Sequence, residues 1–410
     1  MSTRTDAQQI IQSALAACLP DAAVRRALEG KEFSSGRIYL VAAGKAAWQM
    51  AQCAAQMLGD RLTAGVVVTK YDHSKGEIPH CTVFEGGHPV PDENSFRGTR
   101  AAMELVENLT AQDTVVFLVS GGGSALFECP LVPGDDLARL TKDLLACGAD
   151  IVEMNTLRKR LSAVKGGKFA QLCAPAQVYA IVLSDILGDP LDMIASGPAY
   201  PDSSTKEDAW AIAEKYQLSL TEEMKKLLDV ETPKHLDNVE TVITGSVREL
   251  CTAAAQACQE LGYQPTILTD RLCCQAKEAG SFLASIAKSH ENADHSMAFL
   301  AGGETVVQLS GTGLGGRNQE LALAAAPGIA GMADTVVFSL GSDGTDGPTD
   351  AAGGIVDGNT MEQLACAGLS VHQVLAENDA YHALKAVDGL LFTGPTGTNV
   401  NDVAVVLIKR

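Results

Sequence analysis

The chain has 410 residues, and its 31 basic residues against 50 acidic residues give a formal net charge of −19. Its hydrophobic content of 46% is too high for a disordered protein, and no apolar run approaches the ~18 residues that a membrane helix needs. The negative charge opposes non-specific binding to nucleic acids and to anionic membranes, because both are polyanions. The length predicts two or three domains, each with its own core.

The N-terminal segment predicts a packed helix, because apolar residues recur at helical spacing between Ile10 and Leu19. Gln12 and Ser13 interrupt the continuous apolar region that a signal peptide requires. The 11 cysteines include no C-x-x-C pair, so neither a zinc site nor a thioredoxin-like redox motif is expected. Together these features predict a protein of the reducing cytoplasm.

Further along the chain, apolar β-branched runs alternate with Ala-rich amphipathic stretches, a pattern typical of an α/β fold with a parallel sheet. A charged helical stretch over residues 203–238 predicts a boundary between a first domain, residues 1–237, and a second domain, residues 238–410. Ligands of such sheets bind at the carboxyl ends of strands, so the turns there are the expected site. Nine strands are predicted, at residues 38–42, 65–69, 114–119, 178–183, 241–244, 266–268, 298–301, 335–340 and 403–408.

The first candidate turn follows the strand at 38–42, where Gly44 and Lys45 precede a helix. The helix dipole disfavours a cation at this end unless an anionic ligand is also present. A lysine that only faces solvent is the alternative, but the position directly after a strand favours a functional Lys45.

A second candidate turn has the sequence SGGGS and consists of Ser120, Gly121, Gly122, Gly123 and Ser124. Three glycines allow backbone N–H groups to turn toward an anion, and the flanking serines add hydroxyls. The turn therefore favours binding of a phosphate or a carboxylate over a merely tight turn. It is not a Walker A loop, since the chain contains no G-x-x-x-x-G-K-[ST] sequence.

Five basic residues fall close together in this acidic chain, namely Arg158, Lys159, Arg160, Lys165 and Lys168. A charge run is in most proteins a solvated face, and that interpretation is slightly favoured here. The local reversal of sign supports the alternative, in which Arg158 and Lys165 bind an anion.

Carboxylates crowd the end of the strand at 178–183, where Asp185 and Asp189 lie in the segment SDILGDPLD. Such carboxylates commonly hold Mg²⁺ bound to phosphates, although Asp is also an ordinary turn former. A later loop, SDGTDGPTD, offers Asp343 and Asp346 as less favoured metal ligands, with turn formation as an equal alternative.

Three glycines, Gly311, Gly313 and Gly316, satisfy the G-x-G-x-x-G pattern between a strand-like VVQLS and a helical run. The acidic residue that a dinucleotide site requires about 20 residues further on is absent. Arg317, a cation beside these glycines at the start of the helix, instead predicts a phosphate or carboxylate clamp.

Eight segments carry a resemblance to a known family: AGKAA, GGHPVPDENS, SGGGSALF, NTLRKRLSAVKGGKFA, SDILGDPLDMIASGP, GGRNQELAL, SLGSDGTDGPTDAAG and TGPTGTNVNDVAV. In this order they resemble the class II glycerate 2-kinases, the MOFRL-type family. The resemblance runs from about residue 5 to the C-terminus.

The resemblance implies ATP-dependent transfer of a phosphoryl group to the 2-hydroxyl of D-glycerate, which gives 2-phosphoglycerate and ADP. It also implies a Rossmann-like N-terminal domain, a smaller C-terminal α/β domain of MOFRL type, Mg²⁺, and an active site in the cleft between the domains. Within that family, the residues that match Lys45 and Arg317 are important. Members have also been labelled hydroxypyruvate reductases, so an NAD(P)H-dependent reductase is the alternative activity.

On this basis the SGGGS turn is expected to hold a phosphate chain or the glycerate carboxylate, with Lys45 and Arg317 beside the γ-phosphoryl group. Asp185 and Asp189 are the expected Mg²⁺ ligands. A third interpretation is a non-catalytic protein that senses a sugar acid or nucleotide for regulation. The sequence contains no DNA-binding motif that would support it. The expected partners are small molecules, D-glycerate and ATP, with no nucleic acid and no membrane, and a homodimer is left open.

Overall fold

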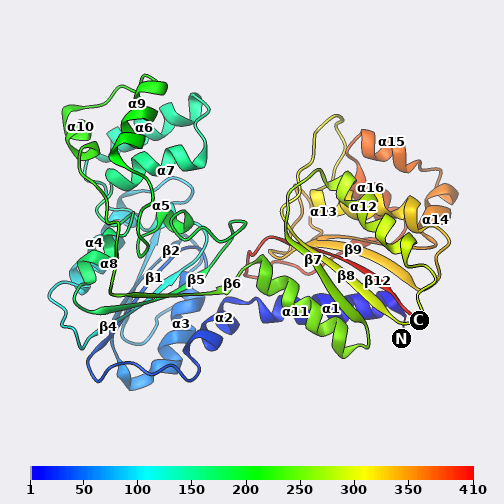
Figure 1. The fold of residues 1–410 in the computed structure, drawn as a ribbon, viewed down its shortest axis with the longest axis horizontal. Helices are drawn as coiled ribbons and strands as arrows, with labels where there is room; N and C mark the ends of the chain where they lie inside the picture. The colour runs from blue at the N-terminus through cyan, green and yellow to red at the C-terminus, as the bar shows by residue number, and fades with distance from the viewer. Residues whose placement is uncertain (1) are drawn as a thin grey trace. The chain divides into compact units, whose positions relative to one another are not determined.

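The computed structural model describes residues 2–410, and its internal contacts divide them into two compact units (Figure 1). Each unit contains one six-stranded sheet. The N-terminal unit comprises residues 23–183 and 189–244, and the C-terminal unit comprises residues 2–22, 184–188 and 245–410.

Six strands form the sheet of the N-terminal unit: β1 (Ile38–Ala43), β2 (Leu62–Lys70), β3 (Cys81–Gly86), β4 (Thr114–Val119), β5 (Gln177–Leu183) and β6 (Val239–Gly245). Their order is β3-β2-β1-β4-β5-β6, and the neighbours from β3 to β5 pair in parallel. The central strands β1 and β4 are buried along their whole length, as expected when both faces of a parallel sheet are covered. This strand order is that of Rossmann-type sheets, and it confirms the predicted fold class.

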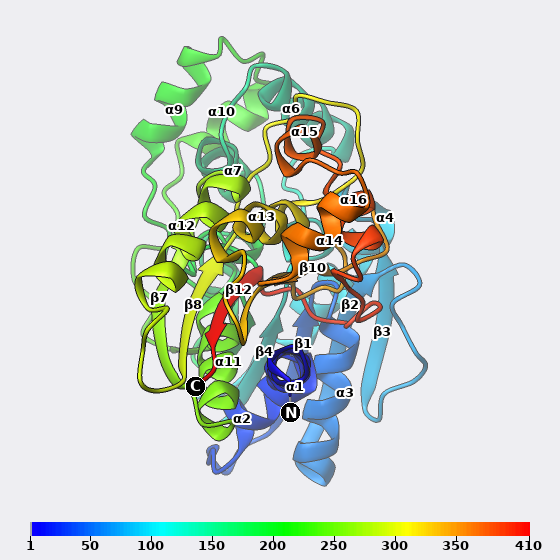
Figure 2. The ribbon, with the colours of Figure 1, turned by 90° about the vertical axis from the view of Figure 1, so that its right-hand side faces the viewer.

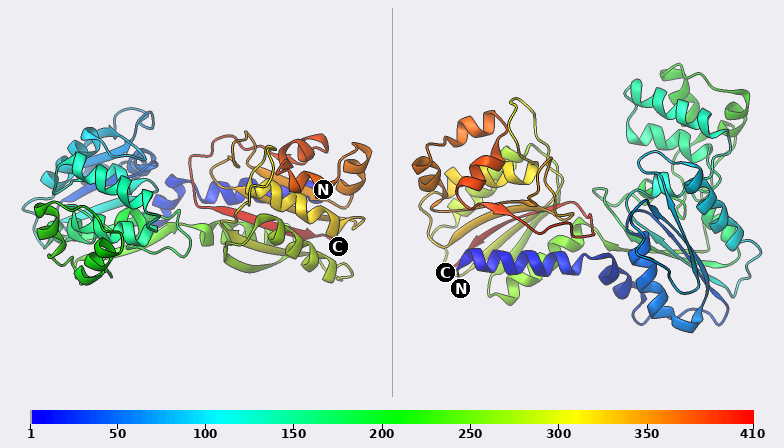
Figure 3. Two further views of the ribbon diagram at one scale, coloured as in Figure 1. Left: turned by 90° about the horizontal axis from the view of Figure 1, so that it is seen from above. Right: turned by 180° about the vertical axis from the view of Figure 1, so that it is seen from behind.

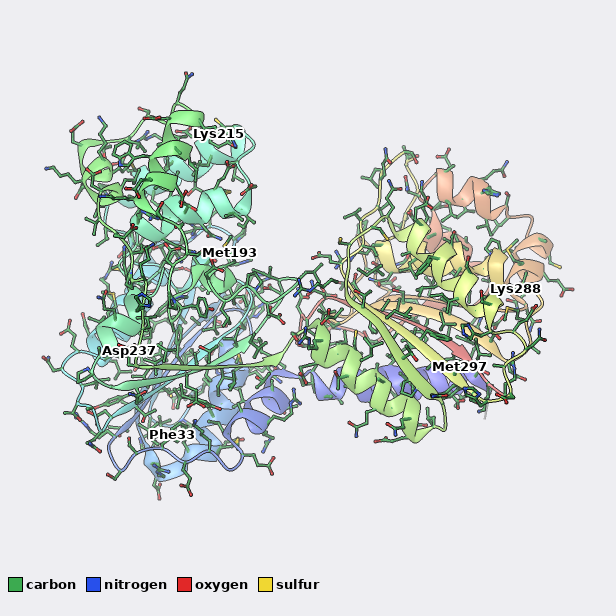
Figure 4. The ribbon with its side chains drawn as sticks, in the orientation of Figure 1. Phe33, Met193, Lys215, Asp237, Lys288 and Met297 are labelled. Carbon is green, nitrogen blue, oxygen red and sulfur yellow. The ribbon has the colours of Figure 1, made fainter. Side chains whose placement is uncertain are left out.

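The helices of this unit follow the strands or form a separate layer. The first group is α3 (Ala47–Leu58), α4 (Glu93–Leu105), α5 (Gly123–Leu126) and α8 (Lys168–Cys173), with the short 3₁₀ helices η1 (Gly59–Arg61) and η2 (Ile194–Ser196). The second group is α6 (Gly134–Ala146), α7 (Ile151–Arg160), α9 (Lys206–Lys215) and α10 (Glu222–Leu228), which share an apolar core. Lys215, labelled at the end of α9 in Figure 4, forms an ion pair of 2.6 Å with Glu153 of α7.

The C-terminal unit has a mixed sheet with the order β11-β10-β9-β12-β8-β7. Its strands are β7 (Gln264–Leu272), β8 (Met297–Gly303), β9 (Thr335–Gly341), β10 (Gly353–Asp357), β11 (Leu390–Leu391) and β12 (Asp402–Ile408). Only β7 and β8 pair in parallel among these strands, and the other neighbours within residues 2–410 are antiparallel.

Helices cover both faces of this second sheet. One face carries α1 (Thr3–Ala17) and α11 (Val247–Glu260), which lie side by side beneath the sheet in Figures 1 and 3. The other face carries α12 (Ala276–Ser289), α13 (Arg317–Ala325), η3 (Ala326–Ile329), α14 (Thr360–Cys366), α15 (Val371–Ala376) and α16 (Ala380–Ala386). Each helical layer therefore has its own apolar core against the sheet.

The predicted N-terminal helix is confirmed as α1, but it packs in the C-terminal unit (Figure 2). Its apolar side chains, including Ile10 and Leu15, contact a core that also contains Leu250 of α11. The buried Asp6 accepts hydrogen bonds of 2.7 Å from both Tyr263 Oη and Lys409 Nζ. The division between the units falls inside α2 (Pro20–Leu28), whose first residues continue the segment of α1.

The predicted strands are confirmed, and the structure adds β3, β10 and β11. Sequence patterns miss β3 because it is a half-exposed edge strand, and they miss β10 because it begins with two glycines. The segment TVITGS was expected to open the second domain, but most of it lies in β6, the edge strand of the first sheet. The compact units therefore part after residue 244, whereas the predicted domains were 1–237 and 238–410.

None of the helices over residues 2–410 combines the length and the apolar character that are needed to cross a bilayer. All 11 cysteines lie within the described part of the chain, and none of them forms a disulfide there.

Candidate active site

In the N-terminal unit, the Lys45 turn and the SGGGS turn lie next to each other, at the point where the strand order of the sheet reverses. From β1 the chain proceeds to β2 on one side, and from β4 it proceeds to β5 on the other side. Such a switch point leaves a crevice at the carboxyl ends of the two central strands, where open α/β sheets bind ligands. Lys45 follows β1, and the SGGGS turn follows β4. The two turns that the sequence proposed separately are therefore neighbours.

Three hydrogen bonds join the Lys45 turn to the SGGGS turn. Lys45 N donates to Gly121 O at 2.9 Å, Ser120 N donates to Ala43 O at 3.0 Å, and Ala46 N donates to Ser120 Oγ at 3.1 Å. Ser120 is only 3% exposed, so its hydroxyl is engaged in joining the turns rather than open to a ligand.

The glycines of the SGGGS turn are required by its geometry. Gly122 has φ +84°, in the left-handed region that favours glycine, and a Cβ at Gly123 would lie 2.7 Å from Ala195 Cβ. The Ser124 hydroxyl lies 3.1 Å from Ser196 Oγ, inside the fold. Within residues 2–410, the N–H groups of Gly121 and Gly122 make no hydrogen bond. The atoms of this turn that are free for an anion are thus backbone atoms, not the predicted serine hydroxyls.

The predicted anion ligands Arg158 and Lys165 lie behind the turn. Lys165 is fully buried, and its Nζ donates to Ser124 O at 2.8 Å and to Phe127 O at 3.1 Å. Arg158 Nη2 also donates to Ser124 O, at 3.1 Å. The buried Glu128 carboxylate lies 3.5 Å from Lys165 Nζ and 3.6 Å from Arg158 Nη2. These groups hold the SGGGS turn in place, so the structure gives them a positioning role.

The other basic residues of this segment are also engaged inside the fold. Lys159 Nζ binds Asp202 at 3.0 Å, and Arg160 is paired with Glu231 at 2.9 Å. Lys168 Nζ donates to backbone carbonyls, including Ser162 O at 2.7 Å. Lys159 and Arg160 are almost wholly buried, so the interpretation of the run as a solvated face was wrong.

Lys45 belongs to a group of basic side chains at the carboxyl edge of this sheet. The group comprises Lys45 after β1, Lys70 at the end of β2, His73, and His88 after β3. His73 Nδ1 donates to Lys45 O at 3.0 Å. Burial and the charges of Lys45, Lys70 and His73 lower the pKa of His88. Residues 2–410 provide no ion-pair partner for Lys45, which is consistent with a cation kept for a ligand.

His88 was missed as a candidate because β3 was not predicted. Without that strand, the motif GGHPVP had no place in the sheet, although it directly follows a strand's carboxyl end. The β-branched and aromatic run at Thr82, Val83 and Phe84, followed by the Gly86-Gly87 pair, was the available signal.

The predicted metal ligands Asp185 and Asp189 fall in different compact units. Asp185 O accepts from Asn401 Nδ2 at 3.2 Å within the C-terminal unit. Asp189, in the N-terminal unit, has a buried Oδ1 that accepts no hydrogen bond from the described residues. In the described chain, residues 2–410, no group of three or more His, Cys, Asp or Glu is arranged to hold a metal ion.

A pocket of about 830 Å³ lies in the C-terminal unit, where Arg317 begins α13. Arg317 makes two hydrogen bonds to Asp402, of 2.6 and 3.1 Å, and one of 2.9 Å to Glu304. Its side chain is 35% exposed, so part of the guanidinium faces the pocket while carboxylates fix its orientation. Asp343 and Asp346, the less favoured metal ligands, also line this pocket.

Asp346 closes the N-terminal end of α13. Its carboxylate accepts from Asn318 N at 3.1 Å and from Gln319 N at 2.8 Å, as a helix-capping group does. Burial raises the pKa of this carboxyl to about 6. Asp343 Oδ1 accepts from Thr345 N at 2.9 Å, which is the turn-forming role.

The G-x-G-x-x-G pattern does not lie in the context of a dinucleotide site. The preceding VVQLS segment is not a strand, and residues 304–316 form an extended loop before α13. A Cβ at Gly311 would lie 2.3 Å from Glu377 Cα, and one at Gly313 would lie 2.4 Å from Asp379 Cβ. These glycines allow two chain segments to approach each other, and the strand-like reading of VVQLS was wrong.

Comparisons with known proteins agree with the fold and the motifs. Residues 6–229 match a domain of unknown function, DUF4147, and residues 297–402 match the MOFRL family. A D-glycerate 2-kinase of Thermotoga maritima is 51% identical over 406 residues, which cover 98% of this chain and 97% of that protein. The chain belongs to the DUF4147–MOFRL family of glycerate kinases.

Two further comparisons bear on this family. The crystal structure of a glycerate kinase from Thermotoga maritima, 51% identical, has a TM-score of 0.94 and covers 98% of this chain and 99% of that chain. A relative from Agrobacterium vitis is 37% identical over 100% of this chain and 95% of its own length, and it carries the provisional name hydroxypyruvate reductase. The resemblance of the sequence motifs to the glycerate 2-kinase family is thus confirmed.

The buried cluster behind the SGGGS turn predicts a stability effect. Lys165→Met leaves Glu128 with one cation and removes the donor to Ser124 O and Phe127 O. We expect the free energy of unfolding to fall by about 3–5 kcal/mol, the usual cost of breaking a buried ion pair. Urea denaturation measures this fall. The exposed Lys142→Met is the matched control, and equal stabilities of the two variants would contradict the positioning role.

The cap of α13 predicts a pH dependence of stability. Because the folded-state pKa of Asp346, about 6, exceeds the ~3.9 of an unfolded Asp, the folded state binds more protons between these values. The contribution of this carboxyl to stability is therefore present below about pH 4 and is lost as the pH rises through 6. Urea denaturation between pH 4 and 6.5 should show that Asp346→Asn removes this downward slope, and identical slopes would refute the assignment.

Proposed function

We propose that the protein transfers the γ-phosphoryl group of ATP to the 2-hydroxyl of D-glycerate, which gives 2-phosphoglycerate and ADP. The observation that carries the proposal is Lys45, a cation without an ion-pair partner among the described residues, at the switch point of a Rossmann-type sheet. Beside it lie the free N–H groups of Gly121 and Gly122. The near full-length identity of 51% to a D-glycerate 2-kinase supports the substrate and the reaction.

Phosphoryl transfer requires mainly positioning and compensation of charge, because the transferred group carries negative charge on its equatorial oxygens. Lys45 and the backbone N–H groups supply a positive field in the N-terminal unit. Arg317 supplies a second fixed cation in the C-terminal unit, oriented by Asp402. We propose catalytic roles for Lys45 and for Arg317, each within its own unit, and we assign the SGGGS turn to a phosphate or to the glycerate carboxylate.

Mg²⁺ is part of this proposal, and the available carboxylates fit it. Mg²⁺ is usually held by one or two carboxylates together with substrate phosphates and water, so a three-residue cluster is not required. Asp189, whose buried Oδ1 accepts no hydrogen bond from the described residues, is a proposed ligand in the N-terminal unit, and Asp185 is a proposed ligand in the C-terminal unit. The ion would neutralise charge on the nucleotide phosphates.

The reductase alternative is disfavoured by the loop at residues 304–316, because a dinucleotide fingerprint needs a strand before its glycines. The sheet order alone does not decide the matter, since Rossmann-type sheets carry many activities. A homodimer and a cytoplasmic location stay predictions.

The activity is tested by incubating the purified protein with ATP and D-glycerate, L-glycerate, tartronate or hydroxypyruvate. We expect ADP release with D-glycerate, and NMR of the product should place the phosphate on the 2-oxygen. A parallel assay follows NADH and NADPH absorbance with hydroxypyruvate. Oxidation of either cofactor, with no ADP release from D-glycerate, would replace the kinase by the reductase.

The two cations predict a loss of activity on substitution. Lys45→Ala and Arg317→Ala should each lower kcat/KM for D-glycerate by at least ~100-fold, the scale of losing one electrostatic contact to the transition state. Lys75→Ala, an exposed lysine of the same unit, is the control for Lys45. Near-normal turnover by either folded variant would remove that residue from the proposed role.

A further inference from the structure

We propose that His88 accepts the proton of the glycerate 2-hydroxyl during phosphoryl transfer. The inference rests on the proposed function, because it assigns a base to that reaction. It derives from the position of the imidazole beside Lys45 and the SGGGS turn, and from the unengaged nitrogens of its ring in the described chain.

The end of β3 places His88 at the same crevice as Lys45. Gly86 pairs with Lys70 in the parallel register of β3 and β2, so the chain leaves the sheet at its carboxyl edge. An ideal Cβ on Gly122 would lie 3.0 Å from Cδ2 and 3.1 Å from Nε2 of His88, and 3.1 Å from Cγ of Lys45. The imidazole and the Lys45 side chain therefore both lie against the glycine whose N–H group is free.

The surroundings of His88 keep its imidazole neutral. The charged groups that act on it are Lys45, Lys70 and His73, and no carboxylate of the described residues is among them. Together with burial, these groups lower the pKa of His88 below its usual value of about 6.5. At neutral pH the ring thus has a nitrogen that can accept a proton. In the described part of the chain, neither ring nitrogen makes a hydrogen bond.

Three other titratable side chains of the nearby loops make hydrogen bonds within the fold. Glu85 Oε1 accepts from Ser74 N at 2.9 Å, and Asp92 accepts from Tyr71 Oη at 2.6 Å and from Ser95 N at 3.0 Å. His73 uses its Nδ1 to bind Lys45 O. His88 differs from these groups in its position, because its Nε2 and the Lys45 side chain both lie against Gly122.

The proton transfer accompanies the bond changes of the proposed phosphoryl transfer. The 2-oxygen of glycerate forms a bond to the γ-phosphorus, and the bond from that phosphorus to the bridging oxygen breaks with its electron pair on ADP. The hydroxyl proton passes to His88, which becomes an imidazolium. The neighbouring ammonium groups of Lys45 and Lys70 disfavour this charged form, so the proton is then released to solvent.

The first test compares His88→Gln with His235→Gln, an exposed histidine of the same unit. Gln retains a polar group of similar reach but accepts no proton. We expect kcat for His88→Gln to fall by at least ~100-fold at pH 7.5, within the range of general-base catalysis, while the Kd values for ATP and D-glycerate change less than about threefold. The acidic limb of the pH profile should disappear from the residual activity.

The second test moves the pKa of His88 without touching its ring. Lys70→Gln removes one of the charges that disfavour the imidazolium, so the pKa of His88 should rise. NMR titration of the imidazole measures that rise, and the acidic limb of kcat should move upward by the same amount. A limb that stays in place while the NMR pKa rises would overturn the proposal.

Failure of this inference is distinguishable from failure of the proposed function. If the wild-type protein phosphorylates D-glycerate while His88→Gln retains more than half of its kcat or keeps the acidic limb, the role of His88 is refuted and the kinase stands. If the wild-type protein releases no ADP with D-glycerate, the proposed function itself fails, and this role of His88 fails with it.

Discussion

The hydrogen bonds between the Lys45 turn and the SGGGS turn are the constraint on which the candidate site depends. They join two loops that belong to neighbouring parallel strands, and they require glycine at Gly44 and a hydroxyl at Ser120. A Cβ on Gly44 would lie 2.2 Å from Ser120 Oγ. Because this joint is buried, the cation of Lys45 and the free N–H groups of Gly121 and Gly122 keep a fixed relation to each other. Preorganised donors of this kind stabilise charge without rearranging during the reaction.

The distribution of charge explains how an acidic chain can bind small anions. Most cations of the 158–168 segment are buried and paired, where they stabilise the fold behind the SGGGS turn. Lys45 lies in front of the turn, where no carboxylate of the described residues pairs with it. The cation of the C-terminal unit is arranged differently, because Arg317 forms ion pairs with Asp402 and Glu304. A ligand there meets a guanidinium whose direction is already set by its carboxylate partners.

The repeating apolar patterns of the sequence predicted the fold well. The roles of individual residues were harder to predict. Most of the nine predicted strands were readable because they contain buried, apolar β-branched runs, whereas β3 is a half-exposed edge and β11 has two residues. Lys45 and the SGGGS turn were found because they directly follow such strands. Arg158 and Lys165 were misjudged, because a charge run in the sequence does not reveal that Glu128 and two carbonyls are buried beside it. His88 was overlooked because its strand was overlooked.

The N-terminal helix α1 packs against a sheet whose central strand, β12, ends only two residues before the C-terminus. Asp6, near the first residue, hydrogen-bonds to Lys409, near the last. During synthesis, α1 emerges from the ribosome long before β12, the strand that completes its binding surface. The N-terminal unit can therefore fold before the C-terminal unit, which is not complete until β12 has been made. Helix α1 is consequently made early but packed late, and the C-terminal unit is closed by a contact between segments that lie far apart in the sequence.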